Sequence, residues 1–276
     1  MTADLGEGLC LTRDYELWWV DIANSTLYFF SPAKNQRRSF KLPEIASKVL
    51  KVENGVVALA SENGISTFTV ATRKFETVYD QPPLSWSGAA RSNDGCILSN
   101  GDIVVGRMDF CPKLGTGDLV RYGSDQIKIA ATGIAIPNTF VEIEVGYEKF
   151  VLISDSMTKV TKAYSVDSLR QGVPKSFVWH DFNWSMGTPD GGLLASDGNV
   201  YIAMWGGSCI AVLTPDGQYS HALPVDVLQP TSLQEDPETG AIWATSARQG
   251  LSNRQMSSYP LSGQLVNVKI GGRKRG

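Results

Sequence analysis

Apolar and polar residues alternate in short runs along this chain, and the runs recur at a regular interval. The first unit has strand-like runs at 8–11, 17–20 and 26–30, separated by turns at 13–16 and 24–25. Alternation with a period of two indicates half-buried strands. Six apolar landmarks in such runs lie 39 to 50 residues apart: Trp18, Val57, Val104, Val151, Tyr201 and Trp243. A period in the forties with several strands is typical of a propeller blade, so the pattern predicts an all-β, six-bladed β-propeller with a central channel.

Turn signals and length agree with this prediction. Turn sequences precede most landmarks, at Glu53-Asn54-Gly55, Ser99-Asn100-Gly101, Ser196-Asp197-Gly198 and Pro237-Glu238-Thr239-Gly240. Such residues tolerate positive φ or bond their own backbone. The best helical candidate, a weak one, is 44–50. Six units fill the 276 residues without a linker, so we expect one domain over 1–276. Only 1–5 precede the first strand, so either a short clasp or a loosely closed last blade is expected.

Polar residues occupy one fixed place in the repeat. If the units pack around one axis, side chains at that place meet at one end of the channel. The second unit has Ala46 there and offers no polar group. Four of the others lie 11 residues before their landmark and the fifth lies 13 before: Glu7, Asn93, Asp190 and Ser232, and then Asn138. Carboxylate and amide oxygens among them could bind a metal.

Short motifs along the whole chain resemble those of one known family. Each motif is weak alone, but their order and their places in the repeat are specific. The chain resembles the senescence-marker-protein/gluconolactonase/regucalcin (luciferin-regenerating-enzyme-like) family. The motifs are Leu5-Gly6-Glu7-Gly8, Leu17-Trp18-Trp19-Val20-Asp21-Ile22, Arg91-Ser92-Asn93-Asp94-Gly95, Ile136-Pro137-Asn138, Thr188-Pro189-Asp190-Gly191, Pro230-Thr231-Ser232 and Thr245-Ser246-Ala247-Arg248.

The resemblance implies a metal-dependent lactonase. It implies one divalent cation, calcium, zinc, magnesium or manganese, held by Glu7, Asn138 and Asp190. The metal would act as a Lewis acid while a sugar lactone or related small lactone is opened to the hydroxy acid. Asp190 would be both ligand and general base, and Arg91 and Asn93 would contact substrate hydroxyls. Two alternatives stay open: a phosphoester or phosphofluoridate hydrolase on the same metal site, and a non-enzymatic metal-binding propeller.

The third unit departs from the family pattern where relatives contact substrate. Arg107 replaces the usual threonine, and Cys111 stands where relatives often carry an acidic residue. A thiol is a poor hydrogen-bond partner for sugar hydroxyls. If Asp109 and Cys111 line the pocket, the substrate should be smaller, less hydroxylated or anionic. Arg107 would then pair with an anionic group, or else point out between blades.

Charge and cysteine usage exclude some partners and compartments. The net charge is −3 without a basic stripe, which disfavours nucleic acid. No apolar run approaches the length of a membrane span. The four cysteines form no CxxC pair, and Glu7 leaves no room for a signal peptide. We therefore expect a cytoplasmic protein, a monomer or weak homo-oligomer, with a small-molecule lactone as its partner.

Overall fold

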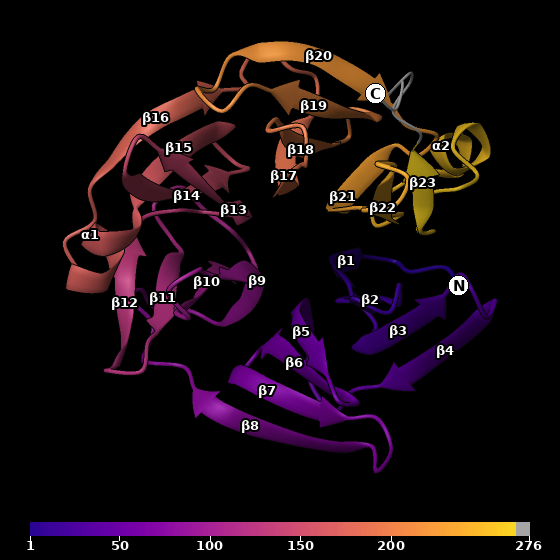
Figure 1. Cartoon of the computed structure of the whole chain (residues 1–276), viewed down its shortest axis with the longest axis horizontal. Coiled ribbons are helices and arrows are strands. Elements are labelled where there is room, and N and C mark those ends of the chain that lie inside the picture. The colour runs from indigo at the N-terminus through magenta and orange to yellow at the C-terminus, as the bar shows by residue number, and fades with distance from the viewer. Residues whose placement is uncertain (269–276) are drawn as a thin grey trace.

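The strands form six sheets arranged around a central axis, with the first strand of each sheet innermost (Figure 1). The computed structural model describes residues 1–268. The first three sheets are β1–β4 (Gly6–Leu11, Leu17–Asp21, Thr26–Ser31, Gln36–Lys41), β5–β8 (Ala46–Glu53, Val56–Ser61, Gly64–Thr69, Lys74–Asp80) and β9–β12 (Ala90–Ile97, Ile103–Asp109, Asp118–Tyr122, Ile127–Thr132). The others are β13–β16 (Pro137–Val145, Glu148–Asp155, Val160–Ser165, Ser176–Asp181), β17–β20 (Thr188–Leu194, Val200–Trp205, Cys209–Leu213, Tyr219–Pro224) and β21–β23 (Gln229–Glu235, Ile242–Ala247, Val266–Val268). The predicted six-bladed β-propeller is confirmed.

The repeat pattern correctly located the second strand of every blade. The six landmark residues fall in β2, β6, β10, β14, β18 and β22. Apolar side chains of these strands pack against the adjacent blade. One cluster joins Trp18 and Leu27 of the first blade to Val57 and Phe68 of the second. Burying such apolar surface gains roughly 25 cal/mol per Å², so the blade-to-blade contacts hold the ring together.

The expected hairpin turns form as their sequences indicate. Asn54 and Gly55 both have positive φ, 50° and 73°, and join β5 directly to β6. Two successive positive φ values define a type I′ turn, whose twist matches that of the flanking strands.

The helical expectation for 44–50 is wrong, because residues 46–50 belong to strand β5. Ala46 and Val49 are buried against the neighbouring blade, and two β-bulges in β5 spread the apolar residues so that they mimic a helical spacing. The described residues contain two short helices, α1 (Val166–Gln171) and α2 (Asn253–Ser258). None of the helices found in residues 1–268 is long and apolar enough to span a membrane.

A short clasp at the N-terminus joins the first blade to the last. Leu5 forms an antiparallel bridge with Ala247. The carbonyl of Asp4 accepts hydrogen bonds from the amides of Arg248 and Gln249 at 3.0 and 2.9 Å. The Asp4 carboxylate also pairs with the Arg248 guanidinium at 2.7 Å. Within the described residues the last blade has three strands, and these contacts fasten it to β1.

Candidate active site

A β-bulge interrupts the inner strand of every blade at the height of the predicted polar residues. In β17 and in β21, two residues lie opposite a single residue of the partner strand. Asp190 is one of the two bulged residues in β17, and Ser232 is one of the two in β21. The bulge of β9 contains Asn93. Glu7 and Asn138 lie directly beside the bulges of β1 and β13. A bulge re-aims a side chain out of the regular alternation, which is how these groups turn toward the axis.

Glycine and hydroxyl residues let neighbouring bulges approach closely. A Cβ on Gly191 would lie 2.7 Å from the Thr231 carbonyl oxygen, so only glycine fits there. The Thr139 hydroxyl donates to the Asp190 carbonyl at 2.7 Å, and the Leu9 amide donates to the Ser232 hydroxyl at 3.1 Å. These bonds cross blade boundaries and satisfy backbone groups that the bulges leave out of the sheet ladders.

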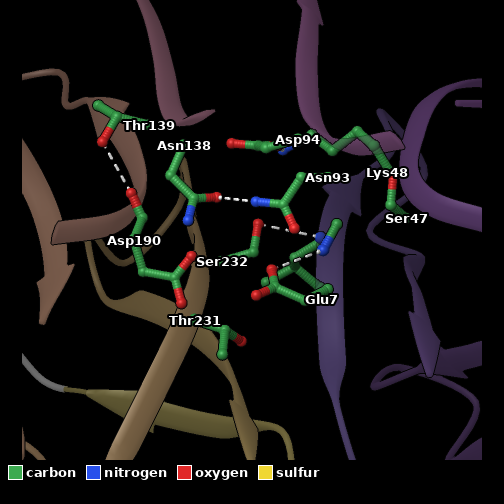
Figure 2. Close-up of polar contacts among 12 residues, drawn as sticks. Glu7, Ser47, Lys48, Asn93, Asp94, Asn138, Thr139, Asp190, Thr231 and Ser232 are labelled. Atoms are coloured by element: carbon green, nitrogen blue, oxygen red, sulfur yellow. Dashed lines mark hydrogen bonds and ion pairs between the residues drawn. The ribbon is translucent and has the colours of Figure 1, made fainter. Parts of the chain in front are cut away.

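Glu7, Asn138 and Asp190 turn toward the same central space (Figure 2). Asn138 and Asp190 are 6% and 5% exposed. Asp190 Oδ1 is buried and has no hydrogen-bond partner among the described residues. Asn138 Nδ2 donates to the Ser156 hydroxyl at 2.8 Å, which fixes the amide with its oxygen on the opposite side. The structure therefore places two carboxylates and one amide oxygen from three different blades at one end of the channel.

Burial disfavours the ionised form of both carboxylates, and nearby cationic side chains offset this effect only in part. Burial, reinforced by the negative charge of Asp94, raises the pKa of Glu7 to about 8. Burial, together with the charges of Glu7 and Asp94, raises the pKa of Asp190 well above its ordinary value. A cation between the two groups would remove this penalty, because an opposite charge favours the ionised form.

The residues fit a hard divalent cation. Carboxylate and amide oxygens are the ligands that such ions prefer, and the Asp190 oxygen without a partner is available for one. Asn138 Oδ1 accepts one hydrogen bond, from Asn93 at 2.9 Å, and keeps a second lone pair. Across residues 1–268, no group of three or more His, Cys, Asp or Glu side chains is placed to hold a metal ion. The candidate set is thus limited to two carboxylates and an amide.

Arg91 and Asn93 adjoin this set as a linked pair. Arg91 donates to Asn93 Oδ1 at 2.8 Å, and Asn93 donates in turn to Asn138. Burial lowers the pKa of Arg91, opposed by the charges of Glu7 and Asp190. The chain of hydrogen bonds orients both side chains beside the carboxylates, where the sequence motif predicted them to contact substrate; that contact stays a prediction.

Arg107 does not join the cluster. The residue is 1% exposed, and its guanidinium forms two 2.7 Å hydrogen bonds with Asp118. It also donates to the carbonyl of Pro82 at 2.6 Å and lies 5.9 Å from the centre of the Trp86 ring. These partners belong to β11 and to the loop 81–89 between the second and third blades. Arg107 anchors that loop, so a substrate anion would have to compete with a buried ion pair for its donors.

Asp109 and Cys111 lie at the rim of the third blade. Asp109 pairs with Ala90 at the end of β10, one position beyond the pair of Met108 and Arg91, so it lies at the same end as the cluster. Its carboxylate accepts from Trp86 Nε1 at 3.2 Å and from the Cys111 amide at 2.8 Å. Cys111 is a free, exposed thiol. A contact of either residue with substrate stays a prediction.

Sequence reasoning missed an ion pair inside the channel. Lys48 Nζ lies 3.0 Å from Asp94 Oδ1, and both side chains are largely buried. Asp94 was part of a motif that alone indicates a turn, but it occupies the bulge of β9 instead. Lys48 carried no signal, because its position depends on the bulge after Ala46.

The chain matches one sequence family over most of its length. Residues 5–248 match the model of the SMP-30/Gluconolactonase/LRE-like region. The chain belongs to this family. Relatives of this family include L-arabinolactonase of Azospirillum brasilense, 26% identical over 275 residues, covering 94% of this chain and 86% of that protein. A second is 6-deoxy-6-sulfogluconolactonase of Pseudomonas putida, 24% identical over 264 residues and covering 94% and 88%.

Solved structures of the family share the fold. The calcium-binding protein regucalcin from Agrobacterium tumefaciens superposes with a TM-score of 0.87 at 23% identity, covering 99% of this chain and 93% of that one. A luciferin-regenerating enzyme superposes with a TM-score of 0.86 at 20% identity, covering 98% and 93%. At these identities the likeness establishes the propeller architecture.

Proposed function

We propose that this protein is a divalent-metal-dependent lactonase that hydrolyses a sugar lactone or a related small lactone to the hydroxy acid. The observation that carries the proposal is a pair of carboxylates, the half-buried Glu7 and the buried Asp190, that face the Asn138 amide, with one Asp190 oxygen lacking a hydrogen-bond partner among the described residues. Relatives named L-arabinolactonase and 6-deoxy-6-sulfogluconolactonase support the substrate class. The neighbour described as calcium-binding supports a divalent cation.

Glu7, Asn138 and Asp190 would hold the cation. When bound, it would polarise the lactone carbonyl and stabilise negative charge on its oxygen. The protein itself must supply a proton acceptor and orient the ring. Asp190 is the candidate acceptor, because its carboxylate faces the channel and offers a second oxygen, Oδ2, besides the Oδ1 that would bind the cation.

Proton transfer through Asp190 balances the reaction. Asp190 takes one proton from water as the water oxygen adds to the carbonyl carbon. The ring C–O bond then breaks, and the proton passes from Asp190 to the leaving alkoxide oxygen, which leaves the hydroxy acid. General-base catalysis of this kind contributes roughly 10²- to 10⁴-fold. Arg91 and Asn93 would meanwhile hold the ring hydroxyls, since their mutual hydrogen bond fixes both side chains.

A panel of lactones in weak buffer, with acid release followed by an indicator dye, tests this function. We expect hydrolysis that a chelator abolishes and added divalent cation restores. Asp190→Asn should lower kcat/KM by about 10²- to 10⁴-fold, and Glu7→Gln should weaken cation binding, both with an unchanged circular dichroism spectrum. Asp167→Asn, an exposed carboxylate on α1, is the matched control.

Two results would contradict the proposal. Full cation content and activity in both Asp190→Asn and Glu7→Gln would remove these residues from the site. Cation-dependent hydrolysis of aryl phosphates with no lactone turned over would instead assign a phosphoesterase to the same residues.

A further inference from the structure

The channel contains a buried ion pair that the proposed reaction does not use. Lys48 Nζ lies 3.0 Å from Asp94 Oδ1, with side chains 15% and 7% exposed. The second carboxylate oxygen, Asp94 Oδ2, is buried and has no hydrogen-bond partner among residues 1–268. Asp94 follows Asn93 directly in β9, which places it next to the candidate site (Figure 2). A carboxylate with an unused, desolvated oxygen beside two others is a potential further metal ligand.

Lys48 stands at the boundary of two compartments of the channel. On one side lies the cluster with Glu7 and Asp190. On the other lies a cavity of about 360 Å³ at the opposite end of the channel, which Lys48 lines together with Val49 and Phe140. Its long side chain thus brings a positive charge from the wall of this cavity to Asp94.

The two charges of the ion pair have opposite effects on the pKa of Glu7 in the candidate site. The charge of Asp94 adds to burial in raising the pKa of Glu7, and the charge of Lys48 opposes that rise. Yet the three carboxylates do not form a common metal-binding group in the described part of the chain. Asp94 therefore acts on the site by its charge while its Oδ1 atom is held by Lys48.

We propose that Lys48 is a positioning residue that holds Asp94 out of the cation's ligand set and so fixes the affinity and charge preference of the site. The inference rests on the proposed cation site of Glu7, Asn138 and Asp190. With Lys48 and Arg91 present, the three carboxylates leave a formal charge of −1, which suits a divalent ion. Without Lys48, Asp94 is free to turn toward the cation as a third carboxylate, and the formal charge becomes −2.

If Lys48 has this role, substitutions of Lys48 and of Asp94 should change calcium affinity in opposite directions, whereas a purely structural ion pair predicts the same direction for both. Calcium binding is measured by titration calorimetry on the whole protein, and terbium binding by luminescence. Lys48→Met should tighten calcium binding about tenfold and terbium binding more, because one positive charge is removed near the ion. Asp94→Asn should weaken calcium binding about tenfold, because Lys48 then faces the site without its partner. The double variant should bind like the wild type.

The control and the outcomes keep the inference separable from the proposed function. Lys51→Met, an exposed lysine on the same strand paired with Glu53, should leave calcium binding unchanged. Weaker binding in both single variants would show a merely structural ion pair and overturn the inference, as would equal affinity in all variants. Absence of divalent-ion binding in the wild type and in Lys48→Met would refute the cation site itself. If Lys48→Met does not fold, Lys48→Gln, which also removes the positive charge, takes its place: tighter calcium binding supports the inference, and unchanged or weaker binding overturns it.

Discussion

Replacing Arg107 by methionine should destabilise the propeller strongly. The methionine keeps the apolar stem but removes five donors. Asp118, whose side chain is fully buried, would lose both 2.7 Å hydrogen bonds from Arg107 and keep only the 3.0 Å bond from Ser85. The carbonyl of Pro82 in the 81–89 loop would lose its donor as well. Removing one partner of a buried ion pair costs about 3–5 kcal/mol, because the other charge stays buried without compensation.

Urea unfolding followed by tryptophan fluorescence measures this loss. A decrease of about 3–5 kcal/mol should lower Tm by roughly 10 °C for a chain of this size. The double variant Arg107→Met/Asp118→Leu should recover most of the stability, since apolar residues can replace a buried ion pair at little cost. Lys74→Met breaks an exposed pair with Glu76 and should cost no more than about 1 kcal/mol.

The same variant separates the anchoring role of Arg107 from contact with substrate. If Arg107 holds the 81–89 loop, destabilisation accompanies any change in activity, and Arg107→Met/Asp118→Leu restores both. A loss below about 1 kcal/mol combined with a changed preference among lactones would refute the anchoring role. That outcome would support the sequence-based expectation that Arg107 faces an anionic substrate.

Three other predictions follow from the site geometry. Gly191→Ala should destabilise the protein by about 1–3 kcal/mol in urea unfolding, because its Cβ would lie 2.7 Å from the Thr231 carbonyl oxygen; no loss would mean that the inner strands can move apart. Without divalent cation, stability should fall as pH rises from 4.5 to about 8, because folded Glu7 keeps a proton that unfolded glutamate releases near pH 4.5. Thermal unfolding across that range checks this, and an unchanged slope in Glu7→Gln would contradict it. Cys111→Glu should raise the rate with gluconolactone relative to smaller lactones, because a carboxylate accepts hydrogen bonds from several hydroxyls; equal ratios in steady-state assays would exclude a role for this rim position.

The sequence predicted the fold because the repeat is visible in residues that pack between blades. Trp18 and Val57 occupy equivalent second strands, and both pack in one interblade cluster, so their spacing reports directly on the architecture. The segment 44–50 was wrongly expected to be helical, because the spacing of its apolar residues does not reveal the β-bulges in β5. Its strand identity depends on hairpin pairing with β6 and on packing against the first blade, and these contacts override a weak helical pattern.

The candidate site was predictable where it follows the repeat and unpredictable where it follows side-chain direction. Glu7 and Asp190 share a fixed place in the unit, so the ring brings them together. Arg107 occupies a strand whose two faces point to different neighbours, and only the structure shows that it faces Asp118. Lys48 gave no sequence signal, since the bulge between Ala46 and Lys48 determines where its side chain points.

The N-terminal clasp makes one boundary of the ring different from the other five. Consecutive blades elsewhere are joined by continuous backbone, whereas the described parts of the first and last blades are joined by packing, by the contacts of residues 3–5 and by hydrogen bonds such as that from Leu9 to Ser232. Transient opening should begin at this seam, and the amide hydrogens of Arg248 and Gln249 should exchange with solvent earlier than those of β14. Glu7 lies two residues beyond Leu5, on one side of the seam, whereas Asn138 and Asp190 lie in other blades. A cation held by all three residues would connect the first blade to the fourth and fifth. Cation binding and closure of the ring should therefore be thermodynamically linked.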